Sequence, residues 1–266
     1  MSKTPDTGVV VHQASAPLLF GKARTMLQEV GIDLASIVGT YEYFVQQQKE
    51  DPELRIPTYR VKIPSGGGKA FDIITGDDEM DTSIPVFRGV VATYHSCNAL
   101  FSGSDSMSEP PICSSDDSVM GIEAATGEFK NCAECPQNQW GSSDKGGRGK
   151  ACKNMRRLYI LVEGSDMPLV MTLPPSSIAA WEKYKSAGLG VQRKSPQEVV
   201  TEFSLTVQTN PQGIKYSVVQ FKAVGVVGNE TRMTIKALGR GEVYNKAVGA
   251  EDFGAAEVLP EVELPL

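Results

Sequence analysis

Histidine is scarce in this chain of 266 residues, which contains only His12 and His95. A site built on several imidazoles is therefore excluded, and neither histidine is followed two positions later by the glutamate that zinc deaminases require. No set of carboxylates has a spacing suited to general acid–base catalysis. The glycine-rich stretch at 65–70 lacks the spacing of a phosphate-binding P-loop and is predicted to be a hairpin turn. These absences predict a protein without enzymatic activity.

The chain also lacks a long apolar stretch. It has no run of about 18 apolar residues that could span a membrane, and its first 20 residues are too polar and too interrupted for a signal peptide. We therefore expect a cytoplasmic protein that makes no membrane contact. Thiols stay reduced in that compartment, so clustered cysteines predict metal binding rather than disulfide bonds.

Four of the five cysteines lie in a segment with almost no apolar periodicity: Cys113, Cys132, Cys135 and Cys152. Small polar residues surround them, so burial of apolar surface would not order this segment by itself. A Cys-x-x-Cys pair supplies two tetrahedral zinc ligands from one tight turn, and the two flanking cysteines complete a set of four thiolates. We predict one structural zinc ion there, with no open position for a catalytic water.

Two alternatives to this metal site remain open. A disulfide or redox pair would also use the clustered cysteines. His95 and Cys97 are rival ligands, but they lie in a largely apolar predicted strand, where a free cysteine is usually a small core residue.

Charge is distributed unevenly along the chain. The formal net charge is −6, yet residues 251–266 carry five acids and no base, whereas residues 145–157 carry six bases and no acid. Such a polarised arrangement is typical of proteins with a phosphate-binding surface and an interacting tail. We expect the acidic tail at 250–266 to be disordered, and either to compete with phosphate for the binding groove or to contact replication proteins.

Apolar periodicity divides the rest of the chain into helices and strands. A leader and two helices are expected within 1–52, and these helices either pack on their own chain or mediate self-association. Strands are expected at 58–63, 69–75, 84–101, 158–163 and 169–173, followed by a helix at 178–186 and a hairpin of 199–208 with 213–227. A last helix is expected at about 230–248.

This order predicts an α+β fold, mainly β. We expect an OB-like, partly open barrel at 53–249, with an inserted zinc-binding subdomain at about 103–156. A β-sandwich would fit the number of strands almost as well.

The basic segment and nearby aromatic residues form a candidate nucleic-acid surface, because a single strand is held by cations along its backbone and by stacking on aromatic faces. On the insert and the strand after it, the candidates are Trp140, Lys145, Arg148, Lys150, Lys153, Arg156, Arg157 and Tyr159. A second wall is expected from the earlier strands, through Arg60, Lys62, Arg88 and Tyr94.

The segments PPICSSDD, NCAECPQNQWGSSDKGGRGKACKN and RRLYILVEG resemble phage-encoded proteins presumed to bind single-stranded DNA. The organisation as a whole, mainly over residues 85–230, resembles the zinc-containing OB-fold single-stranded-DNA-binding proteins of T4-like phages. That family uses three cysteines and one histidine for zinc, whereas this chain offers four cysteines. The resemblance implies a role in phage DNA replication or recombination, in the cytoplasm of the host cell.

Two other classes of function fit parts of the sequence. A zinc-stapled structural or adaptor subunit would use the basic segment to bind protein or RNA. A metal-dependent nuclease is disfavoured, because the chain lacks both histidines and a carboxylate motif.

Overall fold

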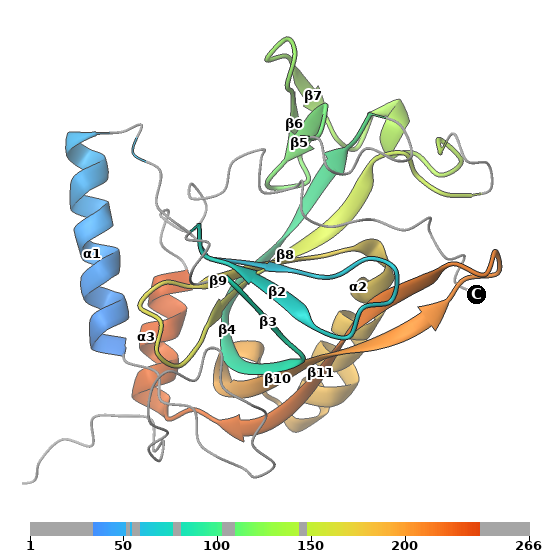
Figure 1. Cartoon of the computed structure of the whole chain (residues 1–266). Helices are drawn as coiled ribbons and strands as arrows, with labels where there is room; N and C mark the ends of the chain where they lie inside the picture. The colour runs from blue at the N-terminus through green and yellow to red at the C-terminus, as the bar shows by residue number, and fades with distance from the viewer. Residues whose placement is uncertain are drawn as a thin grey trace, which may run out of the picture.

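The computed structural model describes residues 34–51, 54, 59–76, 81–102, 110–143 and 148–239. It has the predicted α+β class, mainly β, with a largely open mixed sheet of 11 strands and a few helices (Figure 1). The predicted leader, the first predicted helix and the acidic tail lie outside the described residues, as does the last predicted helix beyond residue 239. Within the described residues, no helix has the length and apolar character needed to cross a membrane.

The long strand β4 (Val86–Leu100) organises the sheet, because it changes partners along its 15 residues. It pairs antiparallel first with β10 (Val199–Thr209), then with β8 (Lys153–Leu161), and finally with β5 (Cys113–Ser115). The sequence predicted a bend near Gly89, and the register with β8 shifts slightly later, between Val91 and Thr93. A Cβ atom at Gly89 would lie 2.6 Å from the carbonyl oxygen of Leu161, so the close approach of β8 requires glycine there.

The remaining strands extend the sheet on both sides of β4 and β8. On one side the order continues through β9 (Leu169–Leu173), β1 (Tyr59–Lys62), β2 (Phe71–Ile74) and β3 (Thr82–Ile84), with β9 and β1 parallel. On the other side β10 pairs with β11 (Lys215–Val226). The Ser217 hydroxyl donates to the Gly68 carbonyl at 2.7 Å, so the turn after β1 touches the β10–β11 hairpin. The OB-like barrel remains an expectation, because the sheet as a whole is largely open.

Helices cover both faces of the central strands. On one face, α2 (Pro175–Lys183) and the π-helical turn after it bury Trp181 and Tyr184 against the apolar side chains of β4, β10 and β11. On the other face, α1 (Leu34–Glu50) and α3 (Asn229–Gly239) bury Ile37 and Ile235 against alternate residues of β4 and β8. The helix α1 therefore packs on its own chain, one of the two arrangements expected for it.

The predicted insert lies at the end of β4 away from β10 and β11 (Figure 1). It contains three short strands that the sequence analysis did not predict: β5, β6 (Met120–Glu123) and β7 (Phe129–Asn131). The predicted start of the next strand, residue 158, is also wrong, because β8 begins at Lys153. Its first residues are polar and only partly buried, so they carry little of the apolar signal by which strands are recognised.

Candidate metal and nucleic-acid sites

The four clustered cysteines line a single pocket where the insert meets the sheet. The residues around this pocket are Asn98, Leu100, Cys113, Ser114, Ser115, Gly121, Lys130, Cys132, Cys135, Gln137, Asn138 and Cys152. The structure therefore brings together all four of the cysteines predicted as zinc ligands. They come from three places: the start of β5, the turn after β7, and the residue before β8.

Backbone hydrogen bonds shape the turn that carries two of these cysteines. The side-chain amide of Asn138 donates to the carbonyl of Cys132 at 2.7 Å, and the Asn138 N–H donates to the carbonyl of Cys135 at 3.0 Å. The N–H of Cys152 donates to the carbonyl of Gln137 at 2.8 Å. These bonds hold the turn against the start of β8, so the fourth cysteine is positioned by the same local structure as the pair.

Gly121 on β6 leaves room for the sulfur atoms. A Cβ atom at this position would lie 3.0 Å from Sγ of Cys113 and 3.6 Å from Sγ of Cys132. Any side chain larger than hydrogen would therefore press on the thiols.

Burial and mutual repulsion disfavour the ionised thiols. Burial is the largest cause that raises the pKa of Cys152, and repulsion from the neighbouring Cys132 and Cys135 raises it further, to about 12. The pKa of Cys113 is raised by the same causes in the same order. Within the described residues, no group of three or more His, Cys, Asp or Glu side chains is arranged to hold a metal ion. The four thiols thus share a pocket without forming a closed coordination shell, and their chemistry fits zinc, which deprotonates the thiols that bind it.

The structure bears differently on the two alternatives for this site. All five cysteines are free thiols, which is compatible with either zinc ligands or a reduced redox pair. Cys97 is fully buried beside Ala99 and Met155, and burial raises its pKa to about 11. Neither Cys97 nor His95 is among the residues that line the pocket.

A network of amide side chains connects the pocket to the sheet. The amide of Asn154 on β8 donates to Oδ1 of Asn98 on β4 at 2.8 Å and to Oδ1 of Asn138 at 2.9 Å. The ammonium of Lys150 donates to Oδ1 of Asn154 at 3.0 Å. Because Asn98 and Asn138 also line the pocket, the network fixes the cysteine-bearing turn to both central strands.

Trp140 is the most exposed aromatic side chain near the pocket, with 72% of its surface accessible. The ammonium of Lys150 lies over its ring, 5.2 Å from the centroid, which is within the range of a cation–π contact. The N–H of Gly141 donates to the carbonyls of Arg148 and Gly149 at 3.1 and 3.0 Å. This closes the loop that starts at Trp140 and brings the exposed Arg148 back towards it.

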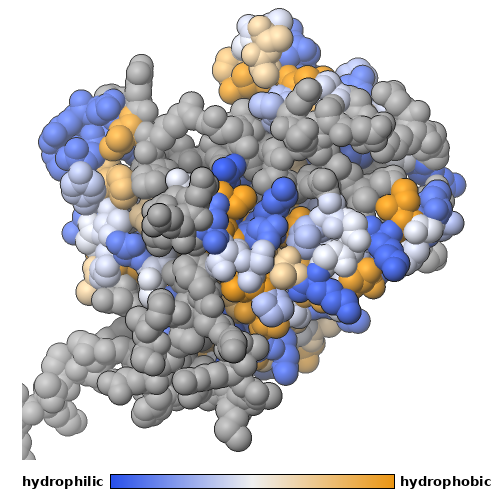
Figure 2. Space-filling model, viewed as in Figure 1, coloured by the Kyte–Doolittle hydropathy of each residue, from blue (hydrophilic) through white to orange (hydrophobic). Residues whose placement is uncertain are grey.

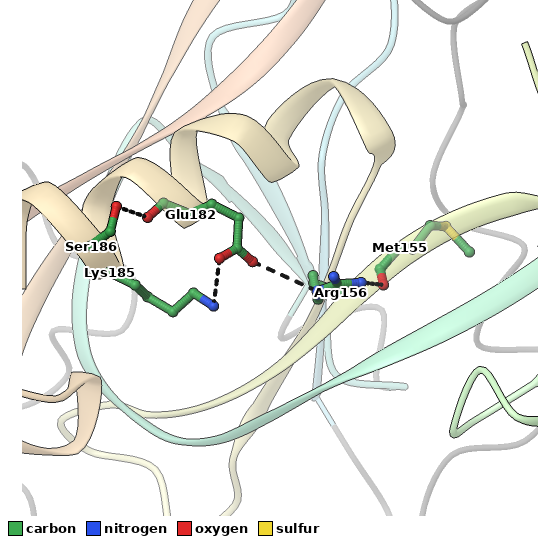
Figure 3. A network of polar contacts seen from close by, with 5 residues as sticks. All are labelled: Met155, Arg156, Glu182, Lys185 and Ser186. Carbon is green, nitrogen blue, oxygen red and sulfur yellow. Dashed lines mark hydrogen bonds and ion pairs between the residues drawn. The ribbon is translucent and has the colours of Figure 1, made fainter. Parts of the chain in front are cut away.

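Arg156 and Lys153 lie at the start of β8, both partly exposed. The guanidinium of Arg156 forms a long ion pair with Glu182 of α2, with the nearest atoms 3.9 Å apart. Glu182 also pairs with Lys185 at 2.9 Å, so the carboxylate lies between two cations (Figure 3). The Lys153 ammonium donates to the carbonyl of Lys150 at 3.0 Å. Arg156 and Lys153 are three positions apart in β8, so their side chains lie on opposite faces of the sheet.

Two of the predicted nucleic-acid contacts are wrong in this structure. Arg157 is fully buried and forms an ion pair with Asp116 at 2.9 Å, between the sheet and the insert. Tyr159 is also fully buried, in the core beneath α1 and α3. Arg157 and Tyr159 are two positions apart and share one face of β8, and the rest of the chain covers that face, a feature that the sequence pattern did not reveal.

Three of the four residues predicted to form a second wall lie away from the insert. Arg88 lies at the opposite end of β4 and pairs with Glu202 at 2.6 Å. Arg60 and Lys62 lie on β1, which β9 separates from β8. Tyr94 packs edge-on against Trp181, 5.2 Å between ring centroids.

The sequence analysis missed one cation, Lys185, that lies near Tyr94. Lys185 lies over the Tyr94 ring at 4.8 Å. Its position four residues after Trp181 on a predicted helix was a signal that could have suggested a shared face. Lys145 lies outside the described residues.

Comparison of the chain with protein-family models, with curated proteins and with solved structures found no match.

Proposed function

We propose that this protein binds single-stranded DNA with little sequence preference, in phage DNA replication or recombination, through the basic surface of a zinc-stabilised insert. The observation that carries the proposal is the exposed ring of Trp140, with the ammonium of Lys150 over it and Arg148 on the same loop. An aromatic ring beside cations is the arrangement that holds a base and its phosphate together. The phage context comes from the sequence resemblance alone.

The exposure of Trp140 leaves its ring accessible to a ligand. The protein has two tryptophans, and Trp181 is fully buried in the core. A large apolar side chain that is 72% exposed, on a loop closed by hydrogen bonds, is already ordered for a flat ligand. Stacking on such a ring is possible for every base, so it favours single strands without selecting a sequence.

In this proposal zinc is held by the four cysteines of the pocket, Cys113, Cys132, Cys135 and Cys152, and its charge would offset the repulsion among their thiolates. The ligands come from separate parts of the insert, so their common attachment to one ion would hold β5, the turn after β7 and the start of β8 together. The amide network through Asn154 would then keep the stacking loop fixed to the sheet. Zinc thus has a structural role and takes no part in a reaction.

The cations set the expected salt dependence. Among the described residues of the segment 140–157, the partly or fully exposed cations are Arg148, Lys150, Lys153 and Arg156. If all four neutralise phosphates, the logarithm of the affinity falls with the logarithm of salt with a slope of about −3. A fourfold rise in salt would then weaken binding about 50-fold.

Fluorescence anisotropy with labelled oligonucleotides tests the proposal. Matched single-stranded DNA, duplex DNA and RNA of one sequence are titrated at several salt concentrations, with and without magnesium. We expect the tightest binding to single-stranded DNA, a steep salt dependence and intact oligonucleotides at the end. Undetectable or salt-insensitive binding to single-stranded DNA would refute the function. Preferred binding to RNA would favour the adaptor alternative, and magnesium-dependent cleavage would favour a nuclease.

A further inference from the structure

The outer face of β6 and β7 is apolar and exposed. Phe129, Ile122 and Met120 are 66%, 46% and 43% accessible, and Ile122 is directly opposite Phe129 in the register. The other face of these strands is turned to the thiols, because Gly121 and Lys130 line the pocket. Figure 2 shows apolar surface on the projection formed by these strands, at the top of the view. This outer face is therefore separate from the proposed stacking loop.

The strand β7 is also a free sheet edge. Among the described residues it pairs only with β6. The carbonyl of Glu128 accepts the N–H of Glu123 at 3.0 Å, and the N–H of Cys132 donates to the carbonyl of Val119 at 2.9 Å. Residues 128, 130 and 132 thus direct their backbone groups to β6. In an antiparallel ladder the alternate residues direct theirs outward, so the N–H and C=O of Phe129 point away from the sheet.

We propose that a second copy of this chain pairs with the β7 edge, antiparallel and about a two-fold axis through Phe129. In that register the two Phe129 residues exchange both of their backbone hydrogen bonds. Their rings meet on the apolar face, next to Ile122. Glu128 then lies directly opposite Lys130 of the partner subunit, and the same pair recurs across the axis. The surface is therefore complementary to itself, as an isologous interface requires.

Charge favours a second copy over nucleic acid as the occupant of this edge. The turn and strand around Phe129 carry Glu123 and Glu128, and Glu134 is exposed just beyond. Lys130 is already paired with Glu123 at 3.0 Å, so the acids outnumber the bases and would repel phosphate. In the dimer each Lys130 keeps its own Glu123 and also faces Glu128 of the partner subunit, so each ammonium lies between two carboxylates, which a strand of phosphates does not offer in that register. This interface is independent of the nucleic-acid proposal.

The interface is tested with two variants, each of which reverses one charge of the Glu128–Lys130 pair. Their self-association is measured by analytical ultracentrifugation of the full-length, zinc-loaded chain. Wild type is expected to show a reversible monomer–dimer equilibrium in the micromolar range. Glu128→Lys places lysine opposite Lys130 of the partner subunit, and Lys130→Glu places glutamate opposite glutamate. Each variant alone is expected to dimerise at least tenfold more weakly. A 1:1 mixture restores both opposite-charge pairs, so a heterodimer as stable as the wild-type dimer is expected.

Phe129→Pro is a second test that does not touch the charges. Because the Phe129 N–H makes no bond to β6, proline removes only the outward donor and should abolish the dimer while leaving the fold intact. Circular dichroism and thermal unfolding, equal to wild type, establish that each variant is folded. The proposal is overturned if wild type is monomeric throughout the micromolar range. It is also overturned if folded single variants dimerise like wild type, or if the mixture fails to recover the dimer.

Discussion

Replacing Trp140 with alanine should weaken binding to single-stranded DNA about 5- to 150-fold, because stacking of one base on an aromatic ring contributes about 1–3 kcal/mol. The side chain is 72% exposed, so its loss should change the free energy of unfolding by less than about 0.5 kcal/mol. Lys150 would lose its cation–π contact but keep its hydrogen bond to Asn154, so the loop should stay closed. The salt slope should therefore be nearly unchanged.

The second tryptophan provides an internal control for this experiment. Trp181 is fully buried, so quenching of intrinsic fluorescence by single-stranded DNA should come from Trp140. Trp140→Phe should keep most of the affinity, measured by anisotropy of labelled DNA, and should lose the quenching. Phe129→Ser, which removes an exposed aromatic ring from the other face of the insert, should leave the affinity for DNA unchanged. Equal affinities for wild type and the alanine variant would refute the stacking role of Trp140.

Three further outcomes are expected. Metal analysis of freshly reduced protein should give one zinc per chain and clearly less for Cys152→Ser, and absence of zinc from the wild type would contradict the four-thiolate site. Gly89→Ala should destabilise the fold by at least about 1–3 kcal/mol, because the new methyl group would lie 2.6 Å from the Leu161 carbonyl. Gly225→Ala, with its nearest neighbour at 3.5 Å, is the matched control and should be neutral or stabilising in chemical denaturation. The side chain of Glu198 accepts hydrogen bonds from the Ser195 N–H, at 2.6 Å, and from the guanidinium of Arg232. The contact with Arg232 lowers the pKa of Glu198 most and the contact with Ser195 lowers it further, from 4.5 to about 2. The stabilisation it provides, about 1–2 kcal/mol, should be present above pH 4.5 and lost as the pH falls towards 2. A stability difference between wild type and Glu198→Gln that did not shrink on acidification would contradict this account.

Much of the fold follows from local patterns. The hairpin of 199–208 with 213–227 was predicted across the turn at 209–212, and its two strands are β10 and β11. The second of the two helices expected within 1–52 was predicted from its apolar periodicity, and it corresponds to α1, which starts at Leu34. By contrast, β5, β6 and β7 are three or four residues long and leave one face to solvent or thiols. Segments that short carry too few apolar residues to show a period.

The candidate site, like the fold, was only partly predictable from the sequence. Trp140 and Arg148 were predicted as nucleic-acid contacts from a basic run beside a tryptophan, and both side chains are exposed. The burial of Arg157 could not be expected, because a charged residue in a basic run usually faces solvent. Its position depends on Asp116, which is 41 positions earlier and reaches it only because the insert folds back over β8.

The sequence by itself determined which residues are available to bind metal and nucleic acid, because spacing and composition are local properties. Four cysteines in a polar segment, a basic run beside a tryptophan and a class of fold rich in β-strands could all be recognised in this way. The tertiary structure alone decided which of them meet. It brings the four thiols to one pocket, buries Arg157 and Tyr159, and separates Arg60 and Arg88 from the insert. The reason is that β4 pairs with three different strands along its length, and such long-range pairing leaves no local trace in the chain.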